Sequence, residues 1–154
     1  MGSVLLQSQS TGTVRLASAD PSDRPVIDPR FLSAESDLTG LVEAVRLTQQ
    51  YLTAPLLQPW VDQMYPTQTA TDAEIVEHIR QDAGTTFHPV GTAKMGSDTD
   101  PMAVTDAELR VRGVLGLRIA DASVMPQIIR GHTLAPAAFI GHRAADLIAT
   151  GETE

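Results

Sequence analysis

The spacing of apolar residues changes along this chain of 154 residues, and that change restricts the possible folds more than any other feature. Residues 4–7 and 13–17 are short β-forming runs that flank a Gly-containing turn, which predicts an antiparallel hairpin. Residues 26–29 are expected to be extended, since Pro29 cannot donate to a sheet ladder. From about position 37 the apolar residues recur at helical spacing instead, so the chain is predicted to be α+β.

Two helices are expected in the middle of the chain. The first runs from about Asp37 to Leu52, and two prolines soon after Leu52 end it. The second starts at Thr71, because Glu74 three positions later completes a capping box. In that motif the Thr71 hydroxyl accepts from the Glu74 amide, and the Glu74 side chain reaches back. Gly84 marks the end of this helix.

The last third of the chain is expected to contain a strand pair and a helix. Residues 108–112 alternate in polarity as a half-buried strand does, residues 113–116 form a turn, and residues 117–120 return the chain. Residues 135–149 predict a strongly apolar helix. Pro136 is tolerated there because it falls in the first turn, where a proline removes no helical hydrogen bond.

The overall composition excludes several classes of protein. A net charge of −8 argues against nucleic acid and an anionic membrane surface as partners, since both are bound mainly through Lys and Arg. The absence of cysteine excludes disulfides, thiol catalysis and Cys-ligated metals. No run approaches the roughly 20 apolar residues of a membrane span. The N-terminal residues do not form a signal peptide, so a cytoplasmic location is the default expectation.

Two histidines, each beside residues that restrict the backbone, are the strongest candidates for chemistry. Pro89 favours an extended conformation at His88. Gly131 allows a sharp turn just before His132, which follows His88 by 44 residues. A histidine pair can take up or release a proton near neutral pH. Since any single histidine is more often a core or surface residue, the interpretation depends on the pair together with its flanking residues.

Other site chemistries are disfavoured by the spacing of their residues. His78 and His142 are interpreted as solvated helix residues, and without an H-E-x-x-H pattern no metal site is expected. The glycines of residues 91–96 have the spacing of a phosphate loop, but Ser97 stands where such a loop needs Lys. No G-x-S-x-G sequence is present, which argues against a serine hydrolase.

Two further features could bind a polar or anionic ligand. Asp121 follows the expected strand 117–120, and ligands of open α/β sheets gather at the carboxyl ends of strands. An aspartate that simply caps a turn is an equally good interpretation of Asp121. The start of the last helix, just after His132, presents free amides and partial positive charge, which favour a phosphate or the negative charge on a reduced cofactor.

Together these segments resemble the C-terminal region of the glucose-methanol-choline (GMC) flavoprotein oxidoreductases, over about residues 12–147. One block of similarity would be weak evidence, whereas five blocks in the family's order and spacing are strong. The blocks are the entry strand at residues 14–21, the segment 27–32, His88-Pro89-Val90-Gly91-Thr92 with Met95-Gly96, the FAD-contacting strand at residues 117–126, and His132-Thr133 with residues 144–148 of the final helix.

The resemblance implies FAD as cofactor and the oxidation of a primary alcohol to an aldehyde. His88 would be the general base or the stabiliser of the alkoxide, and His132 its hydrogen-bonding partner, while hydride passes from carbon to flavin N5. The pyrophosphate and ribityl chain of FAD would lie near Asp121 and Ala122. The pyrimidine edge of the flavin would face the amides around Thr133, where the helix dipole stabilises negative charge.

Two departures from the family pattern affect these expectations. The dinucleotide fingerprint G-x-G-x-x-G, which lies near the N-terminus in the family, is absent from this sequence. We therefore expect the C-terminal piece of a longer enzyme, or a truncated relative. The choline-oxidising branch usually carries Asn where His132 stands, so the His–His pair is more similar to that of aryl-alcohol oxidases and bacterial alcohol dehydrogenases.

The resemblance assigns residues 1–104 to the substrate-binding domain, as part of an antiparallel sheet with flanking helices. It assigns residues 105–154 to the last strands and helix of an FAD-binding domain. Such a chain leaves a sheet edge and an apolar helix face uncovered, which predicts a partner besides the small alcohol: the N-terminal FAD-binding portion or another chain. The alternatives are a non-enzymatic remnant or assembly module with the same fold, and a cyanohydrin lyase on that scaffold.

Overall fold

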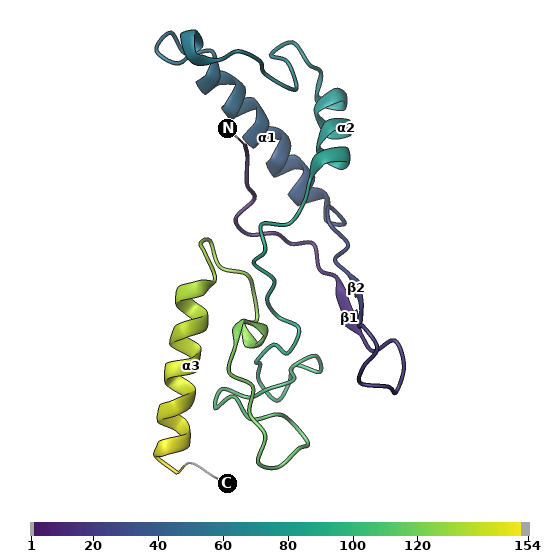
Figure 1. Cartoon of the computed structure of the whole chain (residues 1–154), viewed down its shortest axis with the longest axis vertical. Helices are drawn as coiled ribbons and strands as arrows, with labels where there is room; N and C mark the ends of the chain where they lie inside the picture. The colour runs from purple at the N-terminus through teal and green to yellow at the C-terminus, as the bar shows by residue number, and fades with distance from the viewer. Residues whose placement is uncertain (1, 152–154) are drawn as a thin grey trace. The chain divides into compact units, whose positions relative to one another are not determined.

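The computed structural model describes residues 2–151 and divides into two compact units, with the boundary along the chain between Thr85 and Thr86. Figure 1 labels the strands and α-helices. The first unit contains β1 (Thr13–Arg15), β2 (Val26–Asp28), α1 (Glu35–Leu52), the 3₁₀ turn η1 (Gln58–Trp60) and α2 (Asp72–Asp82), and the second contains the 3₁₀ turn η2 (Ala122–Val124) and α3 (Leu134–Ala149). The α+β class is confirmed, while the assignment of residues 1–104 and 105–154 to two domains of a longer enzyme stays a prediction.

The hairpin of the first unit is formed by β1 and β2, which pair antiparallel with Val14 opposite Ile27. The prediction that residues 4–7 pair with residues 13–17 is therefore wrong. Gly12, just before β1, approaches the end of β2 so closely that a Cβ at this position would lie 2.1 Å from the carbonyl oxygen of Asp28. Non-bonded atoms do not come this close, so the pairing of β1 with β2 requires glycine at position 12.

The N-terminal segment runs along α1 because Asp37 anchors it there. The buried Asp37 carboxylate accepts hydrogen bonds from the Ser8 hydroxyl (2.6 Å) and from the amides of Gln9 and Ser10 (both 2.8 Å). Burial raises the pKa of this carboxyl, but the hydrogen bonds from Ser10, Ser8 and Gln9 outweigh burial and lower the pKa to about 2. The amides of Gln9 and Ser10 are therefore not available to a sheet ladder.

α1 and α2 pack against each other in the first unit, as Figure 1 shows. α2 buries Ile75 and Ile79, which lie four residues apart on one face of the helix. From α1, the buried amide of Gln49 donates to the carbonyl oxygens of Pro66 (3.2 Å) and Thr67 (2.7 Å). Gln49 thus holds the connection that leads into α2 by two hydrogen bonds to its backbone.

The start of α2 has the capping box that the sequence predicts. The Glu74 amide donates to the Thr71 hydroxyl oxygen at 3.3 Å, and the Thr71 amide donates to the Glu74 carboxylate at 2.7 Å. Hydrogen bonding from the Thr71 backbone and hydroxyl lowers the pKa of Glu74. α2 ends at Asp82, two residues before Gly84.

The second unit has its apolar core between α3 and the loops around η2. The buried members of this core are Leu109, Val124, Ala144 and Leu147. α3 begins at Leu134 and carries Pro136 in its first turn, as expected. Within residues 2–151, no helix combines the length and the apolar character that crossing a membrane requires.

The strand pair expected at residues 108–112 and 117–120 is reduced to an antiparallel bridge between Arg110 and Arg118. Backbone hydrogen bonds from Val111 to Leu117 (2.9 Å) and from Ile119 to Leu109 (3.0 Å) flank this bridge, so the two segments do run side by side. A regular strand does not form because Leu109 has a φ of 66°, in the left-handed region that interrupts an extended backbone.

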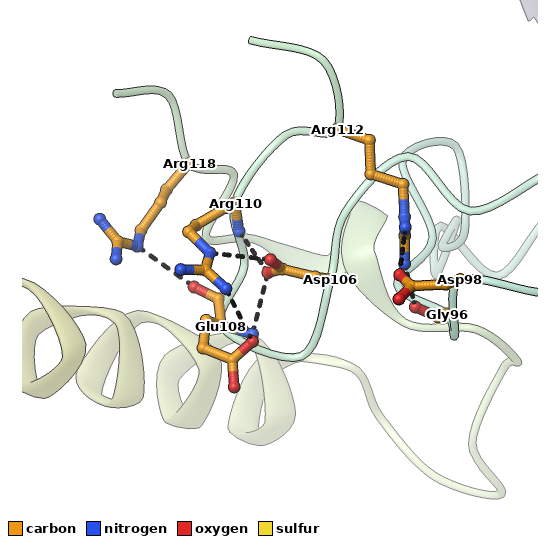
Figure 2. Close-up of polar contacts among 7 residues, drawn as sticks. All are labelled: Gly96, Asp98, Asp106, Glu108, Arg110, Arg112 and Arg118. Atoms are coloured by element: carbon orange, nitrogen blue, oxygen red, sulfur yellow. Dashed lines mark hydrogen bonds and ion pairs between the residues drawn. The ribbon is translucent and has the colours of Figure 1, made fainter. Parts of the chain in front are cut away.

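Charged side chains hold this irregular region in place of a sheet (Figure 2). The Asp106 carboxylate accepts from the Arg110 side chain (2.8 Å) and from the Arg110 amide (2.9 Å). Burial raises the pKa of Asp106, but the hydrogen bonds to Arg110 outweigh burial and lower it. Arg112 donates to the Asp98 carboxylate (2.7 Å) and to the Gly96 carbonyl (2.8 Å). These contacts tie the loop after His88 to the turns that follow it.

Candidate active site

His88 and His132 lie within the second unit and are in direct contact. Nε2 of His88 and Nδ1 of His132 are 2.9 Å apart, a hydrogen-bond distance, although the segments that carry them are separated by 44 residues. The rings meet edge to face, with centroids 5.0 Å apart and planes inclined by 75°. His88 is half-buried and His132 is exposed. Two imidazoles that share one hydrogen bond can relay or share a proton.

The backbone after His88 is fixed by hydrogen bonds to η2. The Ala93 amide donates to the Ser123 carbonyl (3.0 Å), and the Met95 amide donates to the Val124 carbonyl (2.8 Å). Val124 is fully buried in the core of the second unit. A short length of backbone therefore connects His88 to the packed core, to which α3 also contributes residues.

The backbone beside His132 is fixed by the start of α3. Thr133 is the N-cap residue of this helix and is 9% exposed. Its hydroxyl oxygen lies 3.0 Å from Nδ1 of His88. The sequence predicts a role for Thr133 through the backbone amides near it, but not this contact of its hydroxyl. Pro136, which removes one of the amides that an N-cap threonine usually binds, is the sequence signal that could have revealed it.

Asp121 and Ala122 lie at η2, beside the strand-like segment that the sequence indicated. Asp121 is the N-cap of η2, and its carboxylate accepts from the Ser123 amide at 2.8 Å. Hydrogen bonds from the Ser123 side chain and backbone lower the pKa of Asp121. Asp121 thus does cap a turn. The structure brings His88, His132 and Thr133 into mutual contact, and connects η2 to them through the backbone after His88.

The other two histidines lie away from this contact. His142 is exposed on α3 and lies 3.5 Å from Asp146, one helical turn further on. His78 is paired with Asp82 (2.7 Å) and packs edge-on against Tyr65, so it is half-buried rather than freely solvated. In the part of the chain that the structure describes, no group of three or more His, Cys, Asp or Glu side chains is arranged to hold a metal ion.

Comparison with known proteins identifies the family. The family model for the GMC oxidoreductases matches residues 8–141. The oxygen-dependent choline dehydrogenase of Vibrio vulnificus is 41% identical over 142 residues, which cover 91% of this chain and 25% of the relative. The pyridoxine 4-oxidase of Mesorbium loti superposes with a TM-score of 0.88 at 29% identity, over 96% of this chain and 29% of that one.

An FAD-dependent oxidoreductase from Chaetomium thermophilum superposes with a TM-score of 0.82 at 30% identity, over 90% of this chain and 24% of its own. The fold and the site define a class of α+β protein in which a histidine just before the last helix contacts a second histidine from an earlier loop. The chain belongs to the GMC oxidoreductase family. It spans about a quarter of the length of the relatives it matches.

Proposed function

We propose that this chain is the C-terminal catalytic portion of an FAD-dependent alcohol oxidoreductase that converts a primary alcohol to an aldehyde. The observation that carries the proposal is the 2.9 Å contact between His88 Nε2 and His132 Nδ1. Membership of the GMC oxidoreductase family supports it, as do relatives named as dehydrogenases and oxidases of small alcohols.

Two imidazoles in contact can take two different roles when a proton is removed from a hydroxyl group. One ring nitrogen takes the proton from the alcohol, and an N–H of the other ring holds the negative charge that develops on the oxygen. His88 is proposed as the general base or the alkoxide stabiliser, and His132 as its hydrogen-bonding partner at the same oxygen. The exposure of His132 leaves the pair accessible to a small alcohol.

Residues around the pair are proposed to contribute part of the FAD site. When bound, FAD accepts the hydride that leaves the alcohol carbon. The first amides of α3, beside Thr133, lie at the positive end of the helix dipole and suit the electron-rich pyrimidine edge of the flavin. Asp121 is ionised near neutral pH, as an ordinary aspartate is, and a carboxylate suits the ribityl hydroxyls better than the pyrophosphate. The backbone amide of Ala122 is the proposed pyrophosphate contact.

The rest of the flavin site is proposed to lie in an N-terminal portion outside this sequence, because the dinucleotide fingerprint is absent here. That portion is also the proposed partner for apolar side chains that α3 leaves exposed, Leu134 (81%) and Ile148 (60%) among them. A first measurement is the visible absorption of the purified chain with added FAD. Flavin bands that survive desalting would show that this portion binds FAD by itself.

Choline is the first alcohol to assay, because of the choline dehydrogenase relative. Pyridoxine, an aromatic primary alcohol, is the second, since the His–His pair resembles that of aryl-alcohol oxidases. The remnant or assembly module and the cyanohydrin lyase are not favoured, because the matched relatives are named as oxidases and dehydrogenases.

The decisive experiment replaces each histidine in a complete enzyme that contains this chain. We expect His88→Ala to lower kcat/KM by roughly 10²–10⁴-fold, the usual contribution of a positioned acid or base, with FAD absorbance retained. His142→Ala, which removes an exposed histidine of α3, is the matched control and should leave kcat/KM near the original value. Full alcohol oxidation by the His88→Ala enzyme would refute the assignment.

A further inference from the structure

Thr133 begins α3, yet its hydroxyl does not cap the helix. Threonine is a favoured N-cap residue because its oxygen accepts from the second or third amide of the helix. In α3 the third residue is Pro136, which has no N–H, and no side-chain cap hydrogen bond forms. The hydroxyl lies instead 3.0 Å from Nδ1 of His88. The Thr133 hydroxyl therefore contributes a hydrogen bond to His88 and not a cap to the helix.

The direction of this hydrogen bond follows from the donors and acceptors present. Thr133 is buried, and among the residues that the structure describes its hydroxyl has His88 as its hydrogen-bond partner. If the hydroxyl donates to Nδ1, its proton is paired. If Nδ1–H donates instead, the buried hydroxyl proton has no acceptor, which costs about 1–3 kcal/mol. The first arrangement is therefore favoured.

The same reasoning sets the contact between the two rings. A neutral imidazole has one N–H and one ring nitrogen with a lone pair. When Nδ1 of His88 accepts from Thr133, the ring proton must be on Nε2, which lies 2.9 Å from Nδ1 of His132. The Nδ1 atom of His132 is then the acceptor. One hydroxyl thus determines the direction of both hydrogen bonds.

We propose that Thr133 is a positioning residue that holds neutral His88 in the tautomer with its proton on Nε2, directed at His132. When an alcohol hydroxyl replaces the direct hydrogen bond between the two rings, His88 in this tautomer offers its Nε2–H to the reacting oxygen and Nδ1 of His132 accepts the hydroxyl proton. Of the two roles proposed above, His88 then stabilises the alkoxide. The tautomer is a property of this chain and is measurable without cofactor or substrate. Its catalytic meaning rests on the proposed function.

The test is ¹⁵N nuclear magnetic resonance of the histidine rings, at a pH above about 8 where an ordinary imidazole is neutral. In the unmodified chain we expect His88 to show a protonated Nε2 and a lone-pair Nδ1. Thr133→Val keeps the shape of the side chain but removes the hydroxyl, and should convert His88 to a mixture of tautomers. Thr133→Ser should restore the original pattern. Thr150→Val, at the other end of α3, is the control.

A proton found on Nδ1 of His88 in the unmodified chain overturns the proposal, and so does an unchanged pattern in folded Thr133→Val. The unmodified spectrum decides the tautomer even where Thr133→Val fails to fold. In the complete enzyme we expect Thr133→Val to lower kcat roughly tenfold and to alter its pH profile, with Thr133→Ser restoring both. Full activity of His88→Ala would refute the proposed function alone, because the tautomer is read from the chain itself.

Discussion

Asp37 lies in the first turn of α1, with 3% of the residue exposed. Its carboxylate accepts hydrogen bonds from three donors of the N-terminal segment. This residue holds the segment that directly follows the wrongly predicted strand at residues 4–7. The β-forming character of residues 4–7 is visible in the sequence, but the anchor that binds the residues just after them lies 27–29 positions away. Such a contact has no local signature, because many aspartates begin helices without accepting distant hydrogen bonds.

The first prediction concerns the pH dependence of this anchor. The pKa of Asp37 is about 2 in the folded chain against 3.8 for an ordinary carboxyl, so the ionised form stabilises the fold. By linkage, this shift contributes about 2 kcal/mol above the unfolded-state pKa, and the contribution is lost as the pH falls from about 4 to about 2. Asp37→Asn should lower the free energy of unfolding by about 2 kcal/mol near pH 7.

Urea denaturation of the two chains at several pH values measures this effect. The difference in unfolding free energy between the original chain and Asp37→Asn should become smaller as the pH falls from about 4 to about 2. Asp62→Asn, which alters an exposed aspartate of the same unit, serves as the control and should change stability by less than about 0.5 kcal/mol. A difference that stays constant from pH 7 to about pH 2 would contradict the assigned pKa.

At the scale of elements, the three helices are predictable from sequence to within two residues at each end. Their apolar spacing, the capping box at Thr71 and the proline in the first turn of α3 are local signals. The pairing partner of β1 and the narrow bridge between Arg110 and Arg118 depend on distant contacts and on the left-handed backbone of Leu109. For the candidate site, the two histidines are visible as flanked motifs, whereas the hydroxyl of Thr133 needs the three-dimensional structure.

The second prediction tests the capping box of α2. Thr71→Ala removes the hydroxyl that accepts from the Glu74 amide, and so leaves that amide without its cap. We expect a loss of about 1 kcal/mol in unfolding free energy, the usual cost of an N-cap threonine changed to alanine. Thr69→Ala, two residues earlier and outside the helix, is the matched control and should cost less than about 0.5 kcal/mol. Equal losses for the two variants would contradict the cap assignment.

At the scale of the whole molecule, the main feature is the set of apolar side chains that α3 leaves exposed. α3 buries Ala144 and Leu147 on one face, and exposes Leu134, Phe139 and Ile148 to solvent. Apolar side chains exposed along a helix can mark a site of contact with another protein surface. The chain spans about a quarter of the length of its relatives, so the proposed N-terminal portion is the surface expected to cover α3.

The last prediction follows from this exposure. The isolated chain should bind a hydrophobic dye, and replacing Leu134 and Ile148 together by Gln should lower the dye fluorescence measurably. Because both side chains are already exposed, the same substitutions should change the unfolding free energy of the isolated chain by no more than about 0.5 kcal/mol each. In a complete enzyme they should instead destabilise by about 1–3 kcal/mol each, since apolar area would be lost from a covered face.

Leu115→Gln, at a loop leucine that is 98% exposed, is the control for removing one isolated apolar side chain. Monomeric behaviour without dye binding would mean that α3 needs no covering surface, and equal effects in the chain and the complete enzyme would mean that this face is not where the N-terminal portion binds.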